Sequence, residues 1–266
     1  MKNVLLLVHD DDGQEARFQT ALDLTRALDG HLNCVDVTPS LVYGGNNYAG
    51  FGDAILLVDE RESEALNKVQ LTERLTAEDV AWTWVDATGD LANCVLEAAS
   101  LSDVIVLNRA LDDYPLPDMR TITSRVLMHA RKPVVAVPED AKGFRVNGRA
   151  LIAWDGQESI EATVRACVPL LQLASDVEIF MTRDGAEKTE PTEAAAYLSR
   201  SGITATIKII EDGLHAADAL IIEEARQWRA DYVVMGAYTH GRLMEALGGV
   251  TKRMLVKSEF PLVLGH

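Results

Sequence analysis

Residues 231–253, DYVVMGAYTHGRLMEALGGVTKR, decide the fold that this sequence predicts. They begin with the short apolar run 231–235, which lacks the alternation of a half-exposed strand and is typical of a strand buried on both faces of a sheet. A glycine-bearing stretch follows, and a helix is expected to begin near Val250 and Thr251. This order of strand, loop and helix is typical of α/β proteins with a parallel sheet.

The same pattern occurs 128 residues earlier in the chain. DVIVL at 103–107 corresponds to DYVVM at 231–235, and the helix-and-strand pattern at 121–137 corresponds to the one that starts at Gly249. Because order and register both repeat, the sequence predicts two similar domains. The polar, glycine-bearing segment 139–148 is the expected linker.

Earlier elements also come in pairs, one in each half. The expected strands are 4–8 and 150–154, then 32–37 and 177–181, and the expected amphipathic helices are 16–28 and 160–173. We therefore predict an α/β fold of two open parallel-sheet, Rossmann-like domains, residues 1–141 and 147–266. The glycine-rich segment 39–53 is expected to be a loop, either a mobile surface loop or a lid over the first domain's site.

Composition excludes several classes of function. The chain has 266 residues and a net charge of −16, which argues against a broad nucleic-acid-binding surface. No run approaches the roughly 20 apolar residues of a membrane helix, and the N-terminus is not typical of a signal peptide. The three cysteines lie far apart in the sequence, which favours a reducing cytoplasm over a disulfide framework.

The charge is distributed unevenly between the two halves. Residues 1–144 carry 24 acidic and 12 basic side chains, whereas residues 145–266 carry 17 and 13. An anionic ligand is therefore expected in the second half. The basic residues nearest its glycines are Arg242, Lys252, Arg253 and Lys257.

The glycines of the second half predict a phosphate site. Gly236 and Gly241 flank a turn, and Gly248 and Gly249 precede the helix, where backbone N–H groups and the helix dipole attract anions. Thr251 can cap the helix or bind a phosphate oxygen. The alternative is that the glycines serve a tight loop and the cations lie in solvent or complement the helix C-terminus.

The corresponding stretch of the first half, 108–126, contains no glycine and carries Asp112, Asp113 and Asp118, which would repel phosphate. One site per chain is therefore expected, in the second half. Asp155 follows a predicted strand, where it can bind a ribose or Mg²⁺ or cap the next helix. The acids 10–12 are interpreted as a solvated strand end.

No nucleophile, general base or metal-ligand spacing accompanies these residues, so neither catalytic residues nor a metal site are predicted. Three functions stay open: a nucleotide-binding regulator, a scaffold for a non-nucleotide ligand or partner, and a slow Mg-dependent ATPase. The last requires Asp155 to hold Mg²⁺.

With its strand ending in Asp155, DYVVMGA, the glycine loop, GGVT and FPLVL, the whole chain resembles the universal stress protein family in its tandem form. The resemblance implies about five strands per domain and a pseudo-dimer in which strands 134–137 and 262–264 pair; a further homodimer is possible. It also implies ATP or AMP as ligand, with Mg²⁺ only alongside ATP. Nucleotide-binding members have the loop G-x2-G-x9-G-[ST], whereas this chain has G-x4-G-x6-G-G. The residues that the resemblance places in the site are Asp155, Met235, Gly236, Gly241, Gly248, Gly249 and Thr251.

Overall fold

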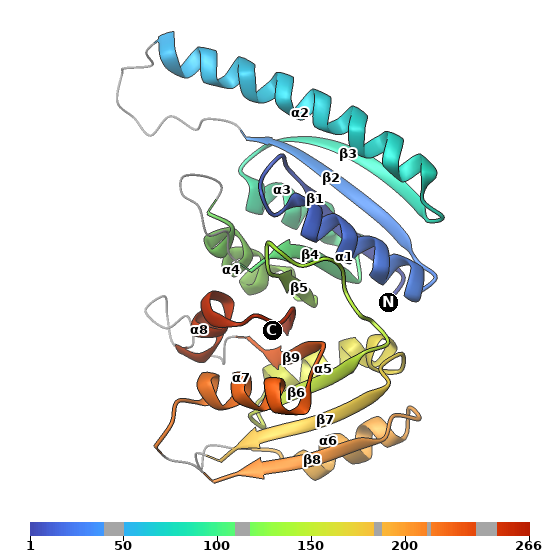
Figure 1. Ribbon diagram of the computed structural model, residues 1–266, viewed down its shortest axis with the longest axis vertical. Helices are drawn as coiled ribbons and strands as arrows, with labels where there is room; N and C mark the ends of the chain where they lie inside the picture. Colours follow the sequence, from blue (N-terminus) through green and yellow to red (C-terminus); the bar gives the residue numbers. More distant parts are fainter. Residues whose placement is uncertain (40–50, 110–117, 184–187, 212–213, 238–248) are drawn as a thin grey trace.

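A single ten-stranded sheet runs through both halves of the chain (Figure 1). The computed structural model describes residues 1–39, 51–109, 118–183, 188–211, 214–237 and 249–266, with the backbone alone for residues 39 and 51–62. The strands of the first half are β1 (Asn3–Val8), β2 (His31–Pro39), β3 (Ala81–Gly89), β4 (Val104–Asn108) and β5 (Val134–Val137). Those of the second are β6 (Arg149–Trp154), β7 (Asp176–Thr182), β8 (Ala205–Ile210), β9 (Tyr232–Gly236) and β10 (Leu262–Gly265).

The strand order is β3-β2-β1-β4-β5-β10-β9-β6-β7-β8, so the two halves have equivalent orders that meet at β5 and β10. The pairs within each half are parallel. This confirms the predicted α/β class with five strands in each half.

Helices cover both faces of the sheet because successive side chains of a strand point to opposite faces. In β1, Val4, Leu6 and Val8 belong to one core and Leu5 and Leu7 to the other. The first core lies under α1 (Gln14–Ala27), α2 (Phe51–Ala77), α5 (Glu158–Leu171) and α6 (Pro191–Ser199). The second lies under α3 (Leu91–Ala98), the 3₁₀ turn η1 (Ala99–Leu101), α4 (Met119–Ala130), α7 (Ala217–Trp228) and α8 (Gly249–Lys257).

The two halves join through an antiparallel strand pair. Leu262 lies opposite Ala136, and Leu264 lies opposite Val134. The pairing closes two strand edges that would otherwise be open. The predicted intramolecular pseudo-dimer is confirmed in this arrangement.

The segment between β5 and β6 is not purely a spacer. Phe144 and Val146 are buried in the core beneath α1 and α5, and the Phe144 ring lies 4.9 Å from the ring of Tyr232. The Phe144 amide donates a 2.8 Å hydrogen bond to Asp23 of α1. The segment therefore contributes apolar contacts to the junction of the halves.

The offset of 128 residues also relates contacts in the structure. Asp90 accepts a 2.8 Å hydrogen bond from Arg125, which joins α3 to α4, and Asp218 accepts a 2.6 Å bond from Arg253, which joins α7 to α8. Each aspartate thus ties together the two helices on the same face of its half.

Helix α2 differs from the prediction. A loop was expected over 39–53, but Pro39 ends β2 and Phe51 begins the 27-residue α2. The loop prediction is wrong at these ends, because a helix continues through the apolar run that follows Phe51. The rest of the segment predicted to be a surface loop or a lid, 40–50, lies outside the described residues. No helix in the described ranges is long and apolar enough to span a membrane.

Candidate functional site

The carboxyl ends of β6 and β9 lie side by side in the second half. Ala153 pairs with Met235, so that Asp155 and Gly236 follow at the same edge of the sheet. Ligands of open α/β sheets bind at this edge. Two of the predicted site residues therefore come together where the fold class places its ligands.

Asp155 forms a tight turn ahead of α5. Its Oδ1 accepts a 3.0 Å hydrogen bond from the Gln157 amide, and the residue is exposed. Gly156 has φ of +67°, a conformation that favours glycine. The Gly156 carbonyl accepts hydrogen bonds from the amides of Lys188 and Thr189 at 3.3 and 3.2 Å. Asp155 thus supports the start of α5 while its carboxylate faces solvent.

Gly236 allows α5 to approach the end of β9 closely. A Cβ at this position would lie 2.5 Å from Ser159 Oγ and 2.7 Å from the Ile160 amide. Any side chain there would therefore push the first turn of α5 away from β9. Gly236 thus ends β9 in close contact with the first turn of α5.

The other predicted site residues divide into three groups. Met235 is buried in the core beneath α7 and α8, and its role there is packing. Gly249 begins α8 and is exposed, whereas Thr251, two residues later, is buried. Gly241 and Gly248 lie outside the described residues. Among the predicted site residues that the structure describes, Asp155 and Gly249 are thus exposed and Gly236 is half-buried.

Asp218 engages two of the four cations that suggested an anion site. Its side chain is 2% exposed and pairs with Arg253 at 2.6 Å and with Lys257 at 3.5 Å. These two cations therefore hold α8 against α7. Lys252 is exposed, and Arg242 lies outside the described residues. The positive charge at the site is thus lower than the sequence indicates.

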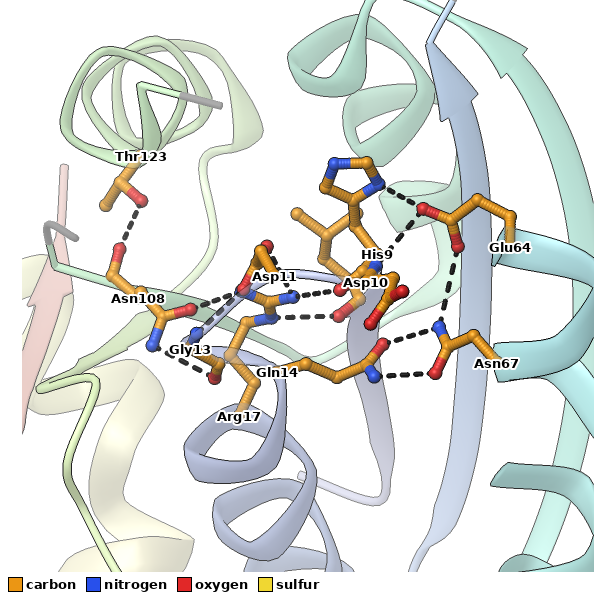
Figure 2. A network of polar contacts seen from close by, with 11 residues as sticks. His9, Asp10, Asp11, Gly13, Gln14, Arg17, Glu64, Asn67, Asn108 and Thr123 are labelled. Carbon is orange, nitrogen blue, oxygen red and sulfur yellow. Dashed lines mark hydrogen bonds and ion pairs between the residues drawn. The ribbon is translucent and has the colours of Figure 1, made fainter. Parts of the chain in front are cut away.

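The equivalent edge of the first half is filled by its own side chains (Figure 2). Asn108 ends β4, as Gly236 ends β9, and its side chain lies where a Cβ on Gly13 would go. The guanidinium of Arg17, from α1, is fully buried and donates to Asn108 Oδ1. Arg17 and Asn108 together occupy the strand ends.

Arg17 is completely engaged in this network. It donates to the carbonyls of Leu7 and His9 at 3.1 and 3.0 Å, and it pairs with the Asp11 carboxylate at 2.8 Å. The Asp11 side chain is only 5% exposed. The interpretation of residues 10–12 as a solvated strand end is therefore wrong for Asp11, because a buried arginine six residues later needs its charge.

The network continues to α2, as Figure 2 shows. His9 Nδ1 lies 2.5 Å from Glu64 Oε1, with both side chains buried, and Gln14 and Asn67 exchange hydrogen bonds of 2.7 and 2.8 Å. Burial lowers the pKa of His9, but the hydrogen bond and charge of Glu64 outweigh it, so the pKa is raised. The first half thus holds a buried polar network at this edge of the sheet.

Burial and then the Glu64 charge raise the pKa of Asp36, on neighbouring β2, to about 6.

No sequence pattern near Asp11 predicted the polar network around Arg17. The available clue was an arginine on the buried side of the predicted helix 16–28. In the described part of the chain, no group of three histidine, cysteine or acidic side chains could hold a metal ion.

The sequence matches no protein-family model and no curated protein. Solved structures do match. A universal stress protein from Archaeoglobus fulgidus DSM 4304 is 15% identical with a TM-score of 0.76, covering 99% of this chain and 97% of that one. A universal stress protein described as putative, from Pseudomonas aeruginosa UCBPP-PA14, is 17% identical with a TM-score of 0.63, covering 100% and 93%. A functionally unknown protein from Pseudomonas aeruginosa PAO1 has the same identity and TM-score. The chain therefore has, along its whole length, the fold found in universal stress proteins.

Proposed function

We propose that the chain is a tandem universal stress protein of the cytoplasm, with domains 1–141 and 147–266, that binds one adenine nucleotide at the carboxyl edge of its second half. The observation that carries the proposal is the contrast between two equivalent strand ends. At the first, Asn108 and buried Arg17 fill the space. At the second, Gly236 ends β9 without a side chain and packs against the start of α5.

The second-half residues fit a nucleotide in chemical terms. The backbone at Gly236 and the N-terminus of α8 at Gly249 would face phosphate oxygens, because helix N-termini supply free N–H donors and partial positive charge. The exposed Asp155 carboxylate would accept hydrogen bonds from the ribose, or bind Mg²⁺ if ATP is the ligand. The role that we assign to the site is regulatory rather than catalytic, because the sequence around these residues carries no motif that pairs a nucleophile with a general base.

The engagement of Arg253 and Lys257 by Asp218 favours a second candidate, a ligand with less negative charge than ATP. AMP or a non-nucleotide ligand would need fewer cations. Mass spectrometry of small molecules released on denaturing the purified protein distinguishes these ligands.

Calorimetry with ATP and AMP tests the proposal. We expect about one site per chain and a loss of affinity of about tenfold in Gly249→Asp, because a carboxylate at the start of α8 repels phosphate. The variant should fold, since the added Cβ meets only the flexible end of Arg253. The matched control is Thr192→Asp, which places the same charge at an exposed position in the first turn of another helix, α6.

Two equivalent nucleotide sites per chain would contradict the proposal. Equal affinities in the wild type and Gly249→Asp would contradict it as well.

A further inference from the structure

The first half of the chain contacts the helix that begins at the proposed site of the second half. Arg109 directly follows β4 and donates from Nη1 to the carbonyls of Leu255 and Val256, at 3.1 and 2.9 Å. Both carbonyls lie in the last turn of α8. A cation there satisfies open carbonyls and complements the negative end of the helix dipole.

The strand pairing explains how this contact arises. Because β5 and β10 are antiparallel, the carboxyl edge of the first half meets the opposite edge of the second half. Helix α8 runs from the carboxyl edge of the second half, where Gly249 begins it, to the amino edge, where Lys257 ends it. That amino edge lies beside the carboxyl edge of the first half. The nine residues of α8 span about 13 Å, so one short helix connects the carboxyl edge of the second half to the place where the first half contacts it.

The backbone of Arg109 is held in place on its own side. Its amide donates a 2.9 Å hydrogen bond to the Val137 carbonyl of β5. Its neighbour Asn108 is fixed by Arg17 and also donates to the Gly13 carbonyl at 3.3 Å. The polar network of the first half therefore sets where the Arg109 side chain starts.

Within the described part of the chain, position 237 of the second half does not make the equivalent contact with the first half. Ala237 is the residue equivalent to Arg109, since its amide donates to the Gly265 carbonyl as that of Arg109 does to Val137. Alanine has no side-chain donor, so position 237 cannot offer α4 the support that Arg109 gives to α8. The asymmetry matches the contrast between Asn108 at the end of β4 and Gly236 at the end of β9.

We propose that Arg109 is a positioning residue through which the first half holds α8, and thereby sets the phosphate affinity of the second-half site. This inference rests on the proposed function for its ligand. Asp218 fixes α8 from the side through Arg253, and Arg109 fixes its C-terminal end. With both in place, the N-terminus of α8 keeps one position relative to β9.

The test combines hydrogen exchange with binding. In Arg109→Met, we expect amides of α8 to exchange about tenfold faster while those of α1 are unchanged, given the strength of charge-assisted hydrogen bonds. We expect ATP to bind about tenfold more weakly and adenosine, which has no phosphate, to keep its affinity. Arg109→Lys should restore part of both effects, because it keeps the charge but lacks the guanidinium fork.

The control is Arg120→Met, which removes the same charge from an exposed position on α4. Unchanged exchange in α8 would overturn the inference, whatever the nucleotide result. Equal losses for ATP and adenosine would also overturn it, since they indicate general damage. If the wild type binds no ATP, the proposed function fails, and the exchange of α8 still decides whether Arg109 positions it.

Discussion

Replacing Arg17 with methionine should be one of the most damaging single changes in the first half. The guanidinium is fully buried, and its removal leaves the Asp11 carboxylate without its partner. The carbonyls of Leu7 and His9 and the amide oxygen of Asn108 lose their donor as well. Methionine retains much of the volume, so the lost interactions dominate the effect.

The size of the loss follows from the buried charge. Removing one partner of a buried ion pair costs about 3–5 kcal/mol. The lost hydrogen bonds to the carbonyls are not added to this free energy, because water that reaches the Asp11 carboxylate also reaches those carbonyls. Each kcal/mol lowers the melting temperature of a chain of this size by roughly 2–4 °C. We therefore expect a decrease of about 6–20 °C.

Urea unfolding followed by circular dichroism measures the loss of free energy of unfolding, and thermal unfolding measures the decrease in melting temperature. Arg26→Met is the control on the same helix, because the Arg26 side chain is 39% exposed and should contribute under about 1 kcal/mol. Adding Asp11→Asn to Arg17→Met removes the unpaired charge and should recover at least about 1 kcal/mol. A loss below about 1 kcal/mol for Arg17→Met would refute the reasoning that this network fills the edge of the first half.

Two further predictions concern pH. The raised pKa of His9 stabilises the fold below its unfolded pKa of about 6.5, and this contribution is lost as the pH rises through the folded pKa. The free energy of unfolding should therefore decrease from pH 6 to 8 in the wild type and less steeply in Glu64→Gln; parallel curves would contradict the buried pair. Burial, with the charge of Glu224, raises the pKa of Glu178 from 4.5 to about 7, so the fold loses stability as the pH rises between these two values and keeps that loss above them. By thermal unfolding, Glu178→Gln should thus be more stable than the wild type at pH 8 and about equal to it at pH 4. A lower melting temperature of the variant at pH 8 would exclude this account.

Local patterns predicted the elements that are buried on both faces. Runs such as VLLLV and DYVVM can form only central strands, and the pairing of 134–137 with 262–264 is confirmed in the structure. Helix α2 was missed because its beginning at Phe51 follows a glycine-rich segment that indicates a loop. Its docking also depends on contacts with residues more than fifty positions away, such as His9 with Glu64.

The candidate site was harder to predict than the fold. Glycine spacing located Gly236 and Gly249 near a strand end and a helix start, as the structure has them. The same reasoning counted Arg253 and Lys257 as free charge, whereas Asp218 holds both from 35 or more positions away. Arg17 was missed for a similar reason. A buried charge can be recognised only when its partners are known, and those partners come from other elements.

The antiparallel β5–β10 junction has a consequence for how the two sites could diverge. Two identical chains related by a twofold axis would carry the same residue at both strand ends. One continuous chain is free of that restriction, and here Asn108 stands at one end and Gly236 at the other. Covalent linkage also gives the partner halves an effective concentration of the order of millimolar, so that their association does not depend on dilution. One half can therefore change the residues at its strand ends while it still pairs with the other half through β5 and β10.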